Sequence, residues 1–181
     1  TNLFMPAEDG AMTDTASGWI AGLLHHAPSM SLFAVPTITG YKRYRAHSLA
    51  PERISWSHDG RGALIRALCR HGDAASRVEN RGGEPAANPY LYLASQMFAG
   101  LEGITAGREA PPATADAYDD ALPRLPSSLN EALALACDDA FVRDQFGATF
   151  MDCYAAIKQA EMAGFAAHVS DWEHHAYFAA F

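Results

Sequence analysis

The 181-residue sequence contains only three cysteines, Cys69, Cys137 and Cys153, and no two of them have C-x-x-C spacing. An odd and widely spaced set is not a disulfide framework, and it argues against structural zinc. The sequence also lacks a basic leader before an apolar core, and no apolar run reaches the length that spans a bilayer. We therefore expect a soluble, cytoplasmic protein with reduced thiols and no membrane contact.

Several motifs that would assign a reaction directly are absent. There is no internal repeat, no G-x-x-x-x-G-K phosphate loop and no G-x-S-x-G nucleophile motif. The composition, 49% hydrophobic and 19% charged, is that of a soluble globular protein, and the length fits one domain with a sizeable core. The first residue is Thr1 rather than Met, which predicts that the sequence starts inside a longer protein.

Basic residues are scarce outside one stretch, from Tyr41 to Arg81. This stretch holds nine of the 13 Lys and Arg residues and only four acidic ones, so it carries +5 in a chain of net charge −8. Its basic residues are Lys42, Arg43, Arg45, Arg53, Arg61, Arg66, Arg70, Arg77 and Arg81. Arginine presents a planar fork that matches carboxylate and phosphate oxygens. The stretch therefore indicates an anionic ligand, with a solvated basic face as the alternative.

The position of Arg66 favours an anionic ligand over a solvated basic face. It lies in the apolar run Ala63–Leu68, which would place apolar side chains on both faces of a strand. Such a strand is buried, and a buried arginine needs an anionic partner. We favour a ligand as that partner over a structural ion pair.

The basic stretch predicts three strands. They cover residues 53–57 and 63–68, joined by a turn at residues 57–60, and residues 76–81. Because side chains alternate along a strand, Arg77, Glu79 and Arg81 share one face. This row is either a self-neutralising ladder or a site that holds a cation on the glutamate and an anion on the arginines. Arg61 follows the turn, where an exposed turn arginine and a functional one fit the sequence equally well.

Helices are predicted before and after these strands in the sequence. The first is capped by Asp14 or Thr15 and stopped by Pro28. His25 and His26 would close it as a helix-end pair in solvent rather than as a metal site.

A second helix starts at Asn88-Pro89 and is expected to be a core element because it has a broad apolar face. The residues of that face are Tyr90, Leu91, Leu93, Ala94, Met97, Phe98 and Leu101. Further helices are predicted after a capping box at residues 128–131, at about residues 147–168, and after a cap at Asp171. The predicted fold class is α+β, with antiparallel strands that form part of an active-site sheet, backed and followed by helices.

Short motifs occur in one order along nearly the whole chain. They are Pro36-Thr37-x-x-Gly40-Tyr41-Lys42-Arg43, Ala50-Pro51, Arg61-x-x-x-x-Arg66, Arg77-Val78-Glu79-x-Arg81, Asn88-Pro89-Tyr90-Leu91, Ala99-Gly100-Leu101-x-Gly103-Ile104 and an ending with Asp171-Trp172-Glu173 and Tyr177-Phe178. In this order and spacing the chain resembles the C-terminal half of the glutamine synthetase catalytic domain, closest to the γ-glutamyl-amine ligase-like branch. The resemblance implies a glutamine-synthetase-like active-site sheet.

The resemblance also implies an ATP-dependent ligase, which joins the γ-carboxylate of glutamate to ammonia or a small amine through a γ-glutamyl phosphate. By their match to the family motifs, Arg43 and Arg81 would bind glutamate. Arg61 would be catalytic and would bind ATP together with Arg66, and Glu79 would bind Mg²⁺ or Mn²⁺. Phosphoryl transfer depends on positioning and charge neutralisation, which arginine forks and a divalent cation provide. One glutamate cannot supply the octahedral coordination of Mg²⁺ alone.

Family members carry further elements before the part that residues 1–181 match. These are a small N-terminal β domain, a Glu-x-Glu metal motif and a glycine-rich segment with a metal-binding histidine. We therefore expect residues 1–181 to be a single piece, the C-terminal part of a catalytic domain, and to be inactive when isolated. The resemblance implies a large homo-oligomer for the full-length protein.

Three positions depart from the family pattern. Gly60 replaces an Asn, Ala74 replaces a Lys that contacts ATP in many members, and Leu49 replaces the Glu that precedes Ala-Pro in ammonia-using members. A carboxylate stabilises a small cation, whereas an isobutyl group offers apolar surface to an alkyl substituent. Leu49 therefore predicts a preference for an alkylamine over ammonia. A shift of a few residues in the alignment would make Glu52 the candidate carboxylate instead.

Two other functions fit parts of the sequence. An inactive structural or regulatory relative is one, since a fold does not determine a function. The intact arginines and Glu79 argue against it. A nucleic-acid binder is the other, and it is least favoured because the chain is acidic overall and the arginines lie in strands and turns. We expect no nucleic-acid partner.

Overall fold

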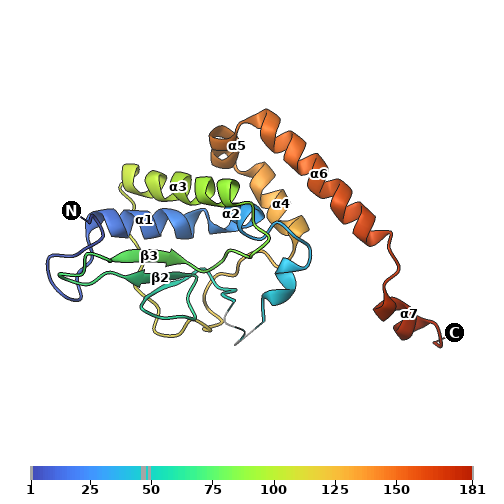
Figure 1. Cartoon of the computed structure of the whole chain (residues 1–181), viewed down its shortest axis with the longest axis horizontal. Helices are drawn as coiled ribbons and strands as arrows, with labels where there is room; N and C mark the ends of the chain where they lie inside the picture. The colour runs from blue at the N-terminus through green and yellow to red at the C-terminus, as the bar shows by residue number, and fades with distance from the viewer. Residues whose placement is uncertain (1, 46–47, 49, 181) are drawn as a thin grey trace.

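The computed structural model describes residues 2–45, 48 and 50–180, and within them it contains seven α-helices, one 3₁₀ helix and three short strands (Figure 1). In chain order these are α1 (Asp14–His25), α2 (Ala27–Ala34), the 3₁₀ helix η1 (Gly40–Arg43), β1 (Trp56–His58), β2 (Ile65–Leu68), β3 (Arg77–Asn80), α3 (Pro89–Thr105), α4 (Leu129–Asp138), α5 (Ala140–Phe146), α6 (Ala148–Ala166) and α7 (Asp171–Tyr177). Helices α1 and α3 lie on one side of the small sheet. The predicted α+β class is confirmed.

The strand order in the sheet is β1-β2-β3, and one of its two pairings differs from the prediction. Strands β2 and β3 are antiparallel as expected, whereas β1 runs parallel to β2. The hairpin turn predicted at residues 57–60 is therefore wrong. Parallel neighbours usually need a long crossover, but β1 and β2 are only three and four residues long. The loop of residues 59–64 has to return the chain by only about 7–10 Å, which a short loop can span.

The helix starts agree closely with the sequence. Thr13 caps α1, whereas Asp14 or Thr15 was the predicted cap, a difference of one or two residues. The helix ends at His25, and Pro28 lies in the first turn of α2, where a missing N–H is tolerated. Asn88 caps α3 as predicted.

Helices α1 and α3 approach each other through glycines. A Cβ atom on Gly103 of α3 would overlap the backbone of Gly18 and Gly22 in α1. The buried side of α3 therefore consists of small residues, Ser95, Ala99, Gly100 and Gly103. Its large apolar residues are exposed, among them Tyr90, Leu93, Met97 and Leu101. The prediction that these four belong to the core is wrong for this chain, because close helix packing selects the small side chains instead.

A second apolar core joins α2 to α4, α5 and α6. Ser128 caps α4, and Leu129, Leu133 and Ala136 face inward as predicted. Beyond this core α6 extends away from the body, with α7 at the far end (Figure 1). The cap of α7 is Ser170 rather than Asp171.

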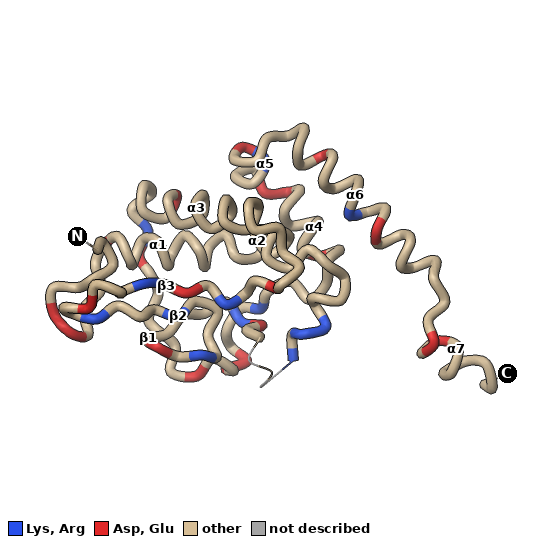
Figure 2. The backbone as a smooth tube through the Cα atoms, in the orientation of Figure 1, with Lys and Arg blue, Asp and Glu red and all other residues tan. Residues whose placement is uncertain are grey.

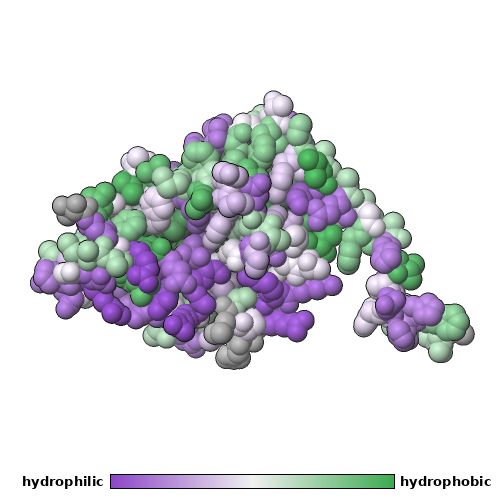
Figure 3. All heavy atoms as spheres, viewed as in Figure 1, coloured by the Kyte–Doolittle hydropathy of each residue, from purple (hydrophilic) through white to green (hydrophobic). Residues whose placement is uncertain are grey.

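Large apolar side chains are exposed on this extension. They are Ile157, Phe165, Val169, Trp172, Tyr177 and Phe178. Figure 3 shows hydrophilic residues gathered over the sheet and its loops, and hydrophobic residues spread along the helices. None of the helices in the described part of the chain is both long and apolar enough to cross a bilayer.

Candidate ligand-binding site

The face of the sheet that α1 and α3 leave uncovered carries the charged residues that the sequence singled out. Ile65 and Ala67 are buried in the core with α1, so Arg66 between them points to the opposite face. Glu79 of β3 stands directly opposite Arg66. Figure 2 shows basic and acidic residues interspersed along the strands and their loops. This uncovered face is the candidate site.

Two carboxylates hold Arg66. Its Nη1 atom donates to Oε2 of Glu79 at 3.1 Å, and its Nε atom donates to Oδ1 of Asp59 at 3.0 Å. The Nη2 atom donates to the same Asp59 oxygen. The Arg66 side chain is only 16% exposed. The prediction that Arg66 needs an anionic partner is confirmed. The partners present are two carboxylates of the chain, which is the structural ion pair that the sequence analysis gave as the alternative to a ligand.

Asp59 is a site residue that the sequence analysis missed. Its Oδ2 atom also accepts from Nη2 of Arg70 at 2.8 Å, so one carboxylate joins two arginines. Hydrogen bonding from Arg66 is the main cause that holds the pKa of the Asp59 carboxyl below its usual value. The available signal was the loop position of Asp59 next to the glycine Gly60, which did not show where the side chain points.

Glu79 also pairs with Arg81. The Nε atom of Arg81 lies 3.4 Å from Oε1 of Glu79, and the Arg81 backbone N–H donates to the Leu64 carbonyl at 2.9 Å. Arg77 is exposed, and its Nη1 atom donates to the Ala75 carbonyl at 3.1 Å. Of the predicted row Arg77, Glu79 and Arg81, Glu79 therefore pairs with Arg81, which directly follows β3, and Arg77 forms no ion pair with the described residues.

Arg43 lies beside the segment that continues from β3. It ends η1, and its two terminal nitrogens are 3.4 and 3.5 Å from the carbonyl oxygen of Gly83. The fold thus brings Arg43 close to the chain just after Arg81. A hollow of about 370 Å³ opens here, lined by Lys42, Arg43, Arg45, Ser48 and Ala50.

Arg61 is exposed on the loop between β1 and β2. Within the described part of the chain it forms no ion pair, so it is not linked by charge pairing to Arg66, Asp59 or Glu79. Its neighbours Gly60 and Gly62 line a cleft of about 320 Å³ together with His58 and residues 114–118. Arg61 is therefore a cation that solvent or a ligand can reach.

Arg53 belongs to the basic stretch but is not available to a ligand. Its side chain is 5% exposed, and Nη1 donates to the carbonyls of Asp120 and Leu122 at 3.2 and 3.0 Å. Its backbone forms an isolated bridge with Arg124 and not the predicted start of a strand. This arginine is structural, so the positive charge of the stretch does not all gather at one site.

The residues present do not form a complete metal site. Within the described residues no group of three or more His, Cys, Asp and Glu side chains is placed to hold a metal ion. Mg²⁺ prefers six oxygen ligands in octahedral geometry. Glu79 could supply one of them, and both of its oxygens face arginines.

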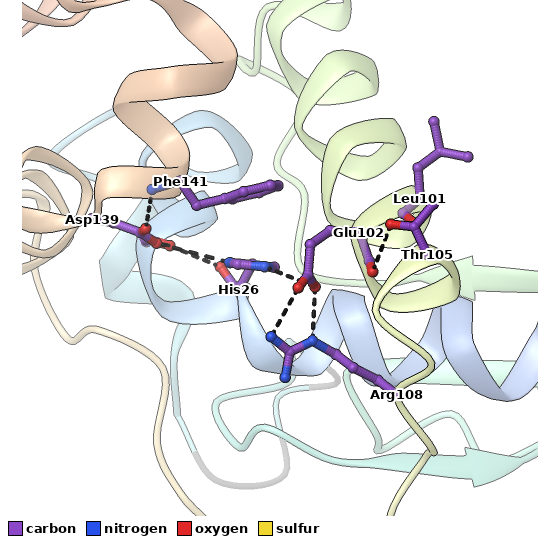
Figure 4. Close-up of polar contacts among 8 residues, drawn as sticks. His26, Leu101, Glu102, Thr105, Arg108, Asp139 and Phe141 are labelled. Carbon is purple, nitrogen blue, oxygen red and sulfur yellow. Dashed lines mark hydrogen bonds and ion pairs between the residues drawn. The ribbon is translucent and has the colours of Figure 1, made fainter.

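A second polar cluster lies where α1, α3 and α5 meet (Figure 4). The Nε2 atom of His26 is 3.2 Å from Oε2 of Glu102, and Nδ1 is 3.8 Å from Oδ2 of Asp139. The imidazole stacks on the Phe141 ring at a centroid distance of 4.1 Å. Arg108 donates to the two Glu102 oxygens at 2.7 and 2.9 Å. This cluster ties the sheet-bearing part of the chain to the helices that follow it.

The prediction of a solvent-exposed histidine pair is wrong for His26 and correct for His25. Burial lowers the pKa of His26 below its usual value, and the hydrogen bond with Glu102 opposes this shift. The hydrogen bond from Arg108 is the main cause that lowers the pKa of Glu102. No local pattern indicated the burial, because Asp139 comes from a distant part of the chain.

The fold and the site define an α+β domain whose small sheet carries a cluster of paired arginines and carboxylates on its uncovered face. A family model for the glutamine synthetase catalytic domain matches residues 1–177. The chain therefore belongs to the glutamine synthetase family, as the sequence motifs indicated.

Individual relatives from the curated proteins belong to the same family of synthetases. The chain is 39% identical to a gamma-glutamylanilide synthase from Acinetobacter sp, and the match covers 98% of this chain and 38% of that protein. It is 36% identical to the gamma-glutamylethanolamide synthetase GlnA4 of Streptomyces coelicolor, with 92% and 36% covered. It is 35% identical to a glutamine synthetase of Halobacterium salinarum, with 95% and 40% covered. The chain thus spans about two fifths of the length of the curated relatives that it matches.

Two solved structures also match nearly the whole of this chain. Apo GmaS without ligand superposes with a TM-score of 0.86 at 26% identity, and the match covers 99% of this chain and 42% of that one. A complex of GmaS with ADP gives a TM-score of 0.86 at 25% identity, with 98% and 43% covered. The predicted likeness to a glutamine-synthetase-like fold is confirmed.

Proposed function

We propose that this chain is the C-terminal part of the catalytic domain of an ATP-dependent ligase that joins the γ-carboxylate of glutamate to an amine. The observation that carries this proposal is the pair of arginines Arg66 and Arg81, which Asp59 and Glu79 hold on the uncovered face of the sheet. The relatives named as γ-glutamyl-amide and glutamine synthetases support the same chemistry.

ATP and glutamate are both anionic, so each needs arginine side chains at its own part of the site. Arg61 and Arg66 are proposed to bind the ATP phosphates, and Arg61 is proposed to stabilise the phosphoryl group during transfer. Arg43 and Arg81 are proposed to bind the carboxylates of glutamate. Charge on the equatorial phosphoryl oxygens is best stabilised by fixed cations that need no rearrangement during the reaction.

A divalent cation would neutralise further phosphate charge. Glu79 is proposed to contribute one oxygen ligand to Mg²⁺ or Mn²⁺. Because this chain groups no further metal ligands within its described residues, the others must come from elsewhere in the complete protein. We therefore expect the 181-residue chain alone to form no product.

The third substrate, the amine, is proposed to be an alkyl- or arylamine rather than ammonia. This proposal comes from Leu49, which lies outside the residues that the structure describes. The names of two relatives, an anilide synthase and an ethanolamide synthetase, support an amine with a carbon substituent. The full-length protein is proposed to be a large cytoplasmic homo-oligomer.

The proposal is tested with the complete protein that contains this chain. Glutamate, ATP, Mg²⁺ and one amine are incubated with it, and the γ-glutamyl amide and ADP are quantified by mass spectrometry and a coupled assay. Ammonia, methylamine, putrescine and aniline are compared by kcat/KM. We expect equal amounts of ADP and amide, with at least one organic amine preferred to ammonia. Hydrolysis of ATP without amide formation would contradict the ligase function, and a clear preference for ammonia would contradict the amine assignment.

A further inference from the structure

Asp59 makes contacts that the proposed roles leave unexplained. Its φ of 55° is in the left-handed region, which aspartate adopts more readily than most residues. Its backbone N–H donates to the Ala67 carbonyl at 3.0 Å. This hydrogen bond ties Asp59 to β2, and the carboxylate reaches Arg66 and, beyond the strand, Arg70.

The donors of Arg66 can be counted. A guanidinium has five N–H groups. The Nε group and one group on Nη2 donate to Asp59, and one group on Nη1 donates to Glu79. Two N–H groups remain, one on each terminal nitrogen. The two carboxylates therefore hold the guanidinium while leaving a pair of donors of the kind that binds phosphate oxygens.

We propose that Asp59 is a positioning residue that orders Arg66 for the phosphates of a nucleotide and ties Arg70 to the same cluster. This inference rests on the proposed function, because it takes Arg66 as a phosphate-binding arginine. Without Asp59, Glu79 is the one remaining carboxylate in contact with Arg66 among the described residues. A long side chain that is already ordered loses less freedom when the ligand binds, so affinity rises.

A competing role would give the opposite sign. If Asp59 merely occupied the arginine fork in the absence of ligand, a nucleotide would have to displace it. Its negative charge would also repel the phosphates. Removing the carboxylate would then strengthen nucleotide binding, whereas loss of a positioning residue weakens it.

The test uses the complete protein and the variant Asp59→Asn. The dissociation constant of ADP with Mg²⁺ is measured by calorimetry, and KM is measured for ATP and for glutamate. We expect the ADP dissociation constant and the KM for ATP to rise fivefold or more, with less than a twofold change in the KM for glutamate. The Asp59→Glu variant keeps the charge and should lie between wild type and Asp59→Asn. Asp144→Asn is the matched control, because Asp144 is an exposed carboxylate on α5.

An unchanged or lower dissociation constant for ADP in Asp59→Asn would overturn the inference. An equal rise in the KM for glutamate would also overturn it, since general damage to the site affects both substrates. If Asp59→Asn melts at a lower temperature than wild type, Asp59→Ser gives the same comparison. The product assay on wild type tests the ligase function separately, so normal ADP binding by Asp59→Asn in an active ligase refutes only the role of Asp59.

Discussion

Glu79 stands directly opposite Arg66 in the antiparallel pairing of β2 and β3, and the two side chains form an ion pair of 3.1 Å on the uncovered face of the sheet. The pair brings a potential metal ligand and a potential phosphate ligand within contact distance before either ligand binds. A divalent cation on Glu79 and a phosphate on Arg66 would therefore be neighbours, as phosphoryl transfer requires.

The first prediction concerns the shape of this arginine. Lysine keeps the charge but cannot donate in two directions from a planar group, so Arg66→Lys loses the simultaneous contacts with Asp59 and Glu79. We expect the KM for ATP in the complete protein to rise roughly tenfold or more. Arg70→Lys is the matched control, because Arg70 is exposed and touches only one of the two carboxylates. Equal rises in the KM for ATP in the two variants would contradict the assignment of Arg66 as a phosphate-binding arginine.

The second prediction separates the structural arginine from the site. Arg53→Met leaves the carbonyls of Asp120 and Leu122 without their buried donor. We expect a loss of about 1–3 kcal/mol in the free energy of unfolding and no change in the KM for ATP. Arg124→Met removes a largely exposed arginine and should change stability by less than about 0.5 kcal/mol. Thermal unfolding of the complete protein measures both, and a larger effect at Arg124 would contradict the assignment.

The third prediction concerns the pH dependence of stability. Burial lowers the pKa of His26 in the folded state, so below about pH 6.5 the unfolded chain binds more protons at this residue. Stability should therefore fall as the pH drops from 6.5, although Glu102 and Asp139 face the ring and reduce the effect.

Between pH 7 and about pH 5.5 the melting temperature of His26→Gln should decrease by less than that of wild type. His25→Gln is the matched control, since His25 is the exposed neighbour, and it should keep the wild-type dependence. An equally steep loss in His26→Gln and wild type would show that other groups cause the acid sensitivity.

Part of this structure follows from the sequence, and the rest depends on tertiary contacts. The caps at Asn88 and Ser128 were predictable because they need only a few neighbouring residues. The parallel course of β1 was not, because the path of the loop after β1 depends on backbone angles, such as the left-handed φ of Asp59, that local residue preferences do not determine. The buried side of α3 was also missed, since apolar periodicity favours large residues and the close contact with α1 requires Gly103.

The candidate site shows the same division. The need of Arg66 for an anion was predictable from the apolar residues around it, and the pairing with Glu79 follows once the strand register is known. Asp59 could not be predicted as its other partner, because a side-chain direction in a loop depends on backbone angles. The burial of His26 depends on Phe141, which is far along the chain and packs on the imidazole ring.

The fourth prediction tests the glycine contact between α1 and α3. A methyl group at Gly103 would overlap the backbone of Gly18 and Gly22, so Gly103→Ala must push the helices apart. We expect it to destabilise the fold by about 1–3 kcal/mol, the usual cost of overpacking. Gly164→Ala in α6 has no neighbour within 4 Å and should stabilise by up to about 1 kcal/mol through helix propensity. Equal melting temperatures for the two variants would contradict the close packing.

The turnover of an Arg61→Lys variant of the complete protein is the most direct test of the proposed ligase site. Arg61 is exposed and unpaired with the described residues, so the substitution should leave the melting temperature unchanged. Loss of its planar fork from the transferred phosphoryl group should lower kcat roughly 100-fold or more, as the removal of a transition-state donor does elsewhere. Arg124→Lys, also at an exposed arginine, should keep normal turnover. If Arg61→Lys forms γ-glutamyl amide at a rate within twofold of wild type, Arg61 takes no part in phosphoryl transfer and the proposed site is wrong.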